Sequence, residues 1–237
     1  MSEFAGKLVL ITGAAGNLGR AVAAAFAAQG ARLALVDLNE EGLEAARAAL
    51  PADITAGIFP TDLIDPRSAS ASVDAIHKQL GEVAVLANIA GGFSMGPPLH
   101  DTSDSTWDLM MNLNARSVFN MARAVIPGML ESGGGRIVNV SARAAREGKA
   151  KMGPYCASKA AVITLTETLA AEHKESGINV NCILPGTIDT PQNRADMPDA
   201  DHGKWVPPAA LADVVVFLAS QAARCVTGAA VPVYGQS

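Results

Sequence analysis

The segment KLVLITGAAGNLG, residues 7–19, carries the strongest fold signal in the chain. Lys7–Thr12 is a run of mostly β-forming apolar residues, and glycines follow at positions 13, 16 and 19 before an alanine-rich stretch begins. Glycine permits a tight turn and a close approach of the backbone to a phosphate. The N-terminus of a following helix offers free N–H groups and a partial positive charge. The segment therefore predicts a strand, a phosphate-binding turn and a helix.

The same alternation of apolar runs and alanine-rich stretches continues along the chain. Near-continuous Val, Ile and Leu runs indicate strands buried on both faces, as in a parallel sheet. We predict an α/β protein: one Rossmann-fold domain over 1–237, with a doubly wound, mostly parallel seven-stranded sheet and helices on both faces. The predicted strands are 7–12, 32–37, 54–59, 83–88, 135–140, 178–184 and 231–234, the predicted helices are 17–29, 40–50, 66–80, 104–131, 155–175 and 208–220, and a long loop is predicted at 186–205.

The composition excludes several functions. The 237 residues include 18 Lys+Arg against 23 Asp+Glu, a net charge of −5, so a general nucleic-acid binder is not expected. The three cysteines, at 156, 182 and 225, form no closely spaced pair, so no metal site or disulfide framework is expected. The 45 alanines, with only 4% aromatic residues, favour helices packed closely on the sheet.

The hydropathy pattern indicates no membrane contact. The longest uncharged run, 83–99, is interrupted by glycines and prolines, whereas a membrane span needs about 20 mostly apolar residues. The first apolar run passes directly into the glycines of the turn, which is unlike a secretory signal. A cytoplasmic protein is therefore expected.

Asp37, at the end of the second predicted strand, bears on the choice of cofactor. A carboxylate there accepts hydrogen bonds from the ribose hydroxyls of a dinucleotide and repels a 2′-phosphate. No Lys or Arg stands at 15, 17, 38 or 39 to meet such a phosphate. The pattern predicts NAD(H) in preference to NADP(H), and a simple loop-capping role for Asp37 is the alternative.

Tyr155 and Lys159 stand four residues apart at the start of a predicted helix, so their side chains share a face. A lysine cation near a phenol favours the phenolate and lowers the pKa of the tyrosine. A tyrosine whose pKa is lowered toward neutral pH can exchange a proton with a substrate oxygen. The pair is common by chance, so its meaning depends on the cofactor turn elsewhere in the chain.

Five separated segments stand in order along the whole chain: TGAAGNLG at 12–19, Asp62-Leu63, NIAG at 88–91, YCASK at 155–159, and Pro185-Gly186 followed by Thr190. Together they resemble the short-chain dehydrogenase/reductase family, and such a set in register is far more specific than any single motif. The resemblance implies hydride transfer between NAD(H) and a small carbonyl or alcohol substrate, with Tyr155 as the acid/base.

The resemblance also implies roles for individual residues. Tyr155, Lys159 and Asn114 would be the catalytic set, with Asn112 as the competitor of Asn114 if the register slips. Asn17 stands where the family usually has its middle glycine. The residues expected to bind the cofactor are Gly13, Gly16, Asn17, Leu18, Gly19, Asp37, Asp62, Leu63, Asn88, Ala90, Gly91, Tyr155, Lys159, Pro185, Gly186, Ile188 and Thr190.

One position departs from the family pattern. Ala142 stands where the catalytic serine is usual, and the serine present is its neighbour Ser141. Neighbouring strand residues point to opposite faces, so Ser141 replaces the missing hydroxyl only if a bulge re-aims it. The segment 141–159, with Ala142 and Met152, resembles dihydropteridine reductases. A quinonoid dihydropteridine-type reductase is therefore one alternative. A dinucleotide-binding sensor or scaffold is another, which Tyr155 and Lys159 argue against.

Loops beyond the strand ends carry the candidate substrate contacts, and ordinary loop packing is the competing explanation for each. The helices predicted at 104–131 and 155–175 are apolar on more than one face, which favours a homotetramer or homodimer. The partner expected otherwise is a small-molecule substrate. The candidate substrate contacts are Phe93, Met95, Ala142, Met152, His202 and Trp205.

Overall fold

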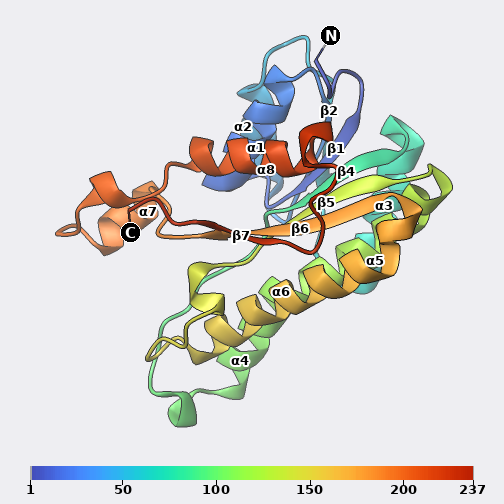
Figure 1. Ribbon diagram of the computed structural model, residues 1–237. Coiled ribbons are helices and arrows are strands. Elements are labelled where there is room, and N and C mark those ends of the chain that lie inside the picture. The colour runs from blue at the N-terminus through green and yellow to red at the C-terminus, as the bar shows by residue number, and fades with distance from the viewer. Residues whose placement is uncertain (1, 237) are drawn as a thin grey trace.

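A computed structural model describes residues 2–236 and shows one seven-stranded sheet (Figure 1). All neighbouring strands are parallel, and their order across the sheet is β3-β2-β1-β4-β5-β6-β7. The predicted doubly wound α/β fold is confirmed. The strands are β1 (Leu8–Thr12), β2 (Arg32–Asp37), β3 (Ala56–Pro60), β4 (Val83–Asn88), β5 (Gly135–Val140), β6 (Ile178–Pro185) and β7 (Ala230–Val233).

Helices cover both faces of the sheet, as Figure 1 shows. Side chains of β1 alternate between two cores: Val9 packs with the helices of one face, and Leu10 with those of the other. This two-sided burial explains why the strands read as continuous apolar runs. One face carries α1 (Asn17–Ala28), α2 (Glu40–Ala48) and α8 (Pro208–Ala219), and the other carries α3 (Pro66–Leu80), α4 (Asp104–Met110), α5 (Ser117–Glu131) and α6 (Gly153–His173).

Local sequence signals set the ends of several helices. The Asp65 side chain accepts a hydrogen bond from Arg67 N, and Pro66 occupies the first turn of α3. Gly81 ends that helix with a φ of +86°, a conformation that L residues with side chains rarely adopt. These signals are short-range, so the prediction placed both ends of α3 correctly.

The structure departs from the prediction at several elements. The helix predicted over 104–131 is interrupted between α4 and α5 by a π-helical segment, Met111–Arg116. The loop predicted at 186–205 contains the helix α7 (Pro191–Asp196), because the Thr190 side chain caps it by accepting a hydrogen bond from Asn193 N. The third strand begins at Ala56 rather than Ile54, because Ile54 N is held in a turn by Pro51 O.

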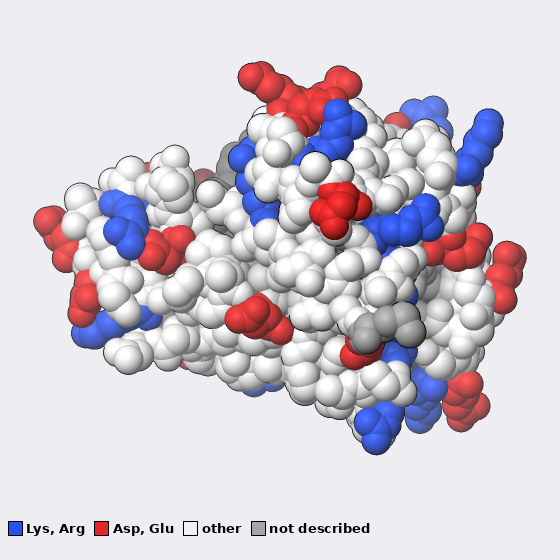
Figure 2. All heavy atoms as spheres, turned by 90° about the horizontal axis from the view of Figure 1, so that it is seen from above, with Lys and Arg blue, Asp and Glu red and all other residues white. Residues whose placement is uncertain are grey.

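The strand order reverses direction between β1 and β4, so the connections from these two strands leave in opposite directions. A crevice forms at the carboxyl ends at such a point, and ligands of open α/β sheets bind there. On the face seen in Figure 2, Lys and Arg side chains are interspersed with Asp and Glu. Among residues 2–236, no helix combines the length and apolar character that a membrane crossing requires.

Candidate active site

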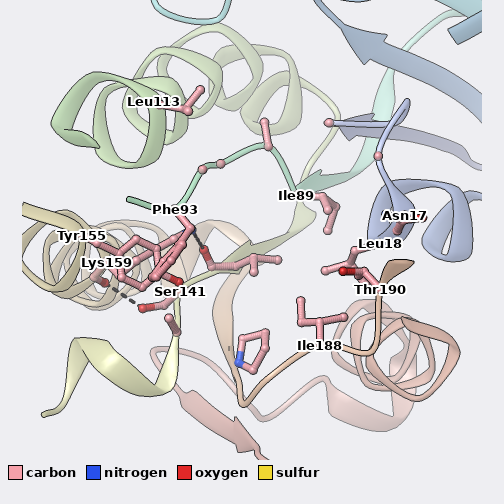
Figure 3. A pocket seen from close by; sticks show the side chains of 18 of the residues that line it. Asn17, Leu18, Ile89, Phe93, Leu113, Ser141, Tyr155, Lys159, Ile188 and Thr190 are labelled. Atoms are coloured by element: carbon pink, nitrogen blue, oxygen red, sulfur yellow. Dashed lines mark hydrogen bonds between the residues drawn. The ribbon is translucent and has the colours of Figure 1, made fainter. Parts of the chain in front are cut away.

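A cavity of about 940 Å³ lies beyond the carboxyl ends of the strands (Figure 3). Its walls come from the turn after β1, the end of β2, the segments after β4, β5 and β6, and the start of α6. Residues from distant parts of the chain meet there because parallel strands all present their carboxyl ends at one edge. The cavity is therefore the place to look for the predicted cofactor and substrate sites.

The glycine turn after β1 is built so that side chains are excluded. Gly13 has a φ of +66°, and a Cβ on it would lie 2.8 Å from the backbone of Ala90. A Cβ on Gly19 would overlap the carbonyl oxygen of Gly13 and lie 2.7 Å from Ala14 Cα. Helix α1 therefore begins in direct contact with the turn, and its N-terminus faces the cavity together with Asn17 and Leu18.

The Asp37 carboxylate is fixed at the end of β2 by two backbone amides. Its Oδ2 accepts a hydrogen bond from Ala15 N at 3.2 Å, and its Oδ1 accepts one from Asn39 N at 3.1 Å. The same carboxylate lines the cavity beside Leu38, whose side chain is 74% exposed. Asp37 therefore caps its own loop and also presents a negative charge to the cavity.

Tyr155 and Lys159 lie on the first turns of α6 and both line the cavity. The Lys159 side chain is buried, and its Nζ donates a hydrogen bond to Val140 O at 2.9 Å. The Tyr155 ring packs edge-to-face with Phe93, with ring centroids 5.0 Å apart (Figure 3). The pair is thus held by the end of β5 on one side and by the segment after β4 on the other.

Burial shifts the pKa of both groups. It raises the pKa of the Tyr155 phenol to about 12 and lowers the pKa of the Lys159 ammonium to about 8. The prediction that Lys159 lowers the Tyr155 pKa is therefore wrong for this structure. The physical reason is that the desolvation of the phenol dominates, while the ammonium is bonded to Val140 O.

The lowered Lys159 pKa predicts a pH-dependent stability that Lys159→Met removes. The unfolded chain has the ordinary lysine pKa of about 10.4, so between pH 8 and that value it binds more protons than the folded protein. The free energy of unfolding contributed by Lys159 then rises with pH in that window. Subtracting the free energy of unfolding of the Lys159→Met protein from that of the wild-type protein cancels the pH-dependent contributions that both share.

The expected result is that the wild-type value minus the Lys159→Met value increases by on the order of 1–2 kcal/mol from about pH 7.5 to about pH 9.5. Urea unfolding of both proteins at the two pH values measures this difference. A difference that stays constant would mean that the folded protein does not penalise the charged lysine.

Asn114 joins the segments that carry Phe93 and Tyr155. Its Oδ1 accepts a hydrogen bond from Gly92 N at 2.9 Å, and its Nδ2 donates to Gly92 O at 3.1 Å and to Ser158 Oγ at 3.0 Å. Ser158 Oγ donates in turn to Tyr155 O at 2.8 Å. The fully buried Asn114 side chain therefore fixes the loop after β4 against the first turn of α6.

The structure also shows what each residue of the Ser141-Ala142 pair does. Ser141 Oγ is buried and donates to Lys159 O at 2.7 Å, so its hydroxyl is used in holding α6. Ala142 has an extended backbone and presents its methyl group to the cavity. The hydroxyl of Ser141 points to Lys159 O, so it does not replace the serine hydroxyl that is missing at position 142.

Most of the predicted site residues line this one cavity, but four of them, Asn88, Asn114, His202 and Trp205, do not. Asn88 is buried in the sheet and donates a hydrogen bond to Asn139 Oδ1. Asn114 is held behind the wall by the contacts above, and Trp205 is buried with its ring against His202, centroids 4.4 Å apart. The predicted residues that line the cavity are Gly13, Gly16, Asn17, Leu18, Gly19, Asp37, Asp62, Leu63, Ala90, Gly91, Phe93, Met95, Ser141, Ala142, Met152, Tyr155, Lys159, Pro185, Gly186, Ile188 and Thr190.

Sequence reasoning missed several lining residues. About half of them directly follow a strand or a residue already singled out, and for these the position just after a strand was the available signal. Leu113 follows no strand and enters the cavity wall from the π-helical segment. The missed residues are Leu38, Thr61, Ile64, Ile89, Gly92, Leu113, Val140, Arg143, Ala144, Lys149, Thr187, Asn193 and Met197. Within residues 2–236, no group of His, Cys, Asp and Glu side chains is arranged to hold a metal ion.

Comparison with known proteins identifies the family. The model of the short chain dehydrogenases matches residues 7–201, which include the glycine turn, Asp37 and the Tyr155–Lys159 pair. The chain belongs to the short-chain dehydrogenase family. The predicted family resemblance is confirmed, and membership identifies the protein as an oxidoreductase. The local resemblance to dihydropteridine reductases finds no counterpart among the relatives described below.

Named short-chain dehydrogenases match nearly the whole chain. D-threitol dehydrogenase of Mycolicibacterium smegmatis is 38% identical, over 94% of this chain and 90% of the relative. Dehydrogenase/reductase SDR family member 6 of Danio rerio is 36% identical, over 99% and 98%. The crystal structure of NAD+-bound xylitol dehydrogenase superimposes with a TM-score of 0.92 at 28% identity, covering 98% of this chain and 99% of that one.

Proposed function

We propose that this protein transfers a hydride between NAD(H) and a small carbonyl or alcohol substrate, with Tyr155 as the acid/base. The observation that carries the proposal is the meeting of the glycine turn and the Tyr155–Lys159 pair in one cavity. A turn that excludes side chains suits a pyrophosphate, and a half-buried phenol beside an apolar wall suits proton exchange with a substrate oxygen.

The walls of the cavity fit the parts of a dinucleotide. Gly13, Gly19 and the N-terminus of α1 would hold the pyrophosphate, since any Cβ at either glycine meets backbone. Asp62 and Leu63 would contact the adenine, and Ile188 and Thr190 the nicotinamide amide. The bound nicotinamide would supply the hydride chemistry. Lys159 would hold the nicotinamide ribose.

The preference for NAD(H) over NADP(H) rests on Asp37. Its carboxylate is fixed by Ala15 N and Asn39 N, so it cannot easily turn away from a 2′-phosphate. The next residue in the chain, Leu38, also lines the cavity and carries no charge. Both facts favour a ribose with a free 2′-hydroxyl.

The double variant Asp37→Ser/Leu38→Arg is expected to change the preferred cofactor. It removes the repelling carboxylate and adds a guanidinium that can pair with a 2′-phosphate, so the NADPH to NADH ratio of kcat/KM should rise about 10²-fold. Asp37→Ser/Leu38→Gln is the matched control, with a long polar side chain but no charge, and should shift the ratio less. A wild-type protein that uses both cofactors equally would contradict the role of Asp37.

A turnover screen tests the proposal as a whole. NADH consumption would be followed with ketones, quinones and quinonoid dihydropterin, and NAD+ reduction with secondary alcohols. Turnover of a ketone or alcohol supports the proposal. Turnover of quinonoid dihydropterin alone supports the pterin alternative, which Ala142 and Met152 in the cavity wall favour. Tight NADH binding without any turnover would favour the sensor or scaffold.

The proposal includes a cytoplasmic homotetramer or homodimer. The oligomer is supported by four large apolar side chains that α4 and α5 leave exposed, Trp107, Leu109, Phe119 and Leu130. Exposed apolar side chains on adjoining helices are typical of protein interfaces.

A further inference from the structure

The segment after β5 offers no free side-chain hydroxyl beside Tyr155 to meet a substrate oxygen. This segment lines the cavity, and its only hydroxyl, on Ser141, donates to Lys159 O at 2.7 Å. Ala142 and Ala144 present methyl groups. Arg143 also lines the cavity, but its Nε lies 3.7 Å from Glu147 Oε1 and its guanidinium carbon lies 5.3 Å from the centroid of the Tyr234 ring. Tyr155 would therefore be the one hydroxyl that meets negative charge on the substrate oxygen from this side.

The surroundings of Tyr155 are apolar. Phe93 packs against its ring, and Met95, Leu113 and Met152 line the same cavity. The nearby cation of Lys149 is paired with Glu147 at 2.7 Å. Such a wall favours an uncharged carbon skeleton and gives an alkoxide little other stabilisation.

A second donor matters most for a carbonyl that cannot stabilise its own negative charge. A simple ketone places the whole developing charge on one oxygen, and losing one positioned donor there costs about 10²–10³ in rate. In a vicinal diketone, the neighbouring carbonyl withdraws electron density and lessens that requirement. The two kinds of substrate therefore differ in how much they need a hydroxyl at position 142.

We propose that the substrates of this site are vicinal diketones or the α-hydroxyketones formed from them. This inference rests on the proposed function and specifies its substrate class. One carbonyl carbon gains a hydride from the reduced nicotinamide, which is oxidised, and the C=O π bond breaks as its oxygen takes the Tyr155 proton. The product is an α-hydroxyketone, and the second carbonyl is unchanged.

The test compares Ala142→Ser with the wild-type protein on two matched pairs of substrates. Diacetyl and butanone share one carbon skeleton, and camphorquinone and camphor share a bulkier one. The wild-type protein should reduce the diketone of at least one pair with NADH and prefer it to the ketone. Ala142→Ser should raise kcat/KM on the ketone about 10²-fold and on the diketone less than about tenfold.

Two control variants separate the donor from other effects. Ala142→Cys adds a side chain of similar size to serine whose S–H is a weak donor. It should therefore raise the ratio of kcat/KM on the ketone to kcat/KM on the diketone less than Ala142→Ser does. Ala150→Ser adds a hydroxyl on an exposed loop position outside the cavity wall and should leave the ratio unchanged. NADH binding and thermal unfolding of each variant show whether the site is intact.

Each outcome bears on one of the two proposals. The diketone inference is overturned if Ala142→Ser raises kcat/KM equally on both members of a pair. It is also overturned if a folded Ala142→Ser protein that binds NADH shows no gain in kcat/KM on the ketone. Both results leave the proposed function standing. Tyr155-dependent reduction of ketones but not diketones also overturns the diketone inference. Failure to reduce any carbonyl, or turnover that is unaffected by Tyr155→Phe, overturns the proposed function itself.

Discussion

Tyr155→Phe should lower kcat by about 10³–10⁴ while leaving NADH binding nearly unchanged. General acid–base groups contribute up to about 10⁴ in rate, and this cavity offers the substrate oxygen no other hydroxyl from the segment after β5. The phenylalanine keeps the ring that packs against Phe93, so the variant removes the proton donor without opening the wall. Steady-state turnover and NADH fluorescence titration measure the two quantities separately.

Tyr234→Phe is the matched control, because it removes the chain's other phenol hydroxyl. Tyr234 follows β7, and it does not line the cavity. Near-wild-type turnover is expected for this variant. If Tyr155→Phe lost activity and NADH binding in parallel, the tyrosine would be a binding residue rather than the acid/base.

The parts of the fold that could be predicted from sequence are those set by local signals. The turn at 12–19 depends on glycines whose spacing is visible in the chain, and Asp65-Pro66 marks a helix start that the structure contains. The open, doubly wound arrangement of the sheet followed from the right-handed rule for parallel crossovers. Most of the residues that would hold a cofactor were named from the family resemblance, whose motifs are visible in the sequence.

The parts that could not be predicted depend on tertiary contacts. The π-helical segment Met111–Arg116 lies inside a uniformly helical pattern, and its buried Asn114 is held by Gly92 and Ser158, far away in sequence. The raised Tyr155 pKa arises from burial that the spacing of Tyr155 and Lys159 does not reveal. The helix α7 does not belong to this group, because Thr190-Pro191 is a local capping signal that is visible in the sequence. The prediction of a loop over 186–205 overlooked this signal.

Gly19→Ala should weaken NADH binding by more than about 10²-fold, because the added methyl group meets backbone rather than a movable side chain. A Cβ at this position overlaps Gly13 O and lies 2.7 Å from Ala14 Cα. The turn can accept the methyl group only by moving α1 away from it, which displaces the N–H groups that would hold the pyrophosphate. Each lost or lengthened charge-assisted hydrogen bond costs about 1.5–3 kcal/mol, so two account for the expected loss.

Two further alanine variants show whether the loss comes from this clash. Gly16→Ala is expected to weaken binding much less, since its Cβ would come no closer than 3.4 Å to Gly13 O. Gly148→Ala, where a Cβ meets nothing within 4 Å, controls for the loss of any exposed glycine. NADH affinity and thermal unfolding are measured for all three. Equal affinity in Gly19→Ala and Gly148→Ala proteins would mean that the turn after β1 does not hold the dinucleotide, and the cofactor site would then have to be sought elsewhere along the cavity.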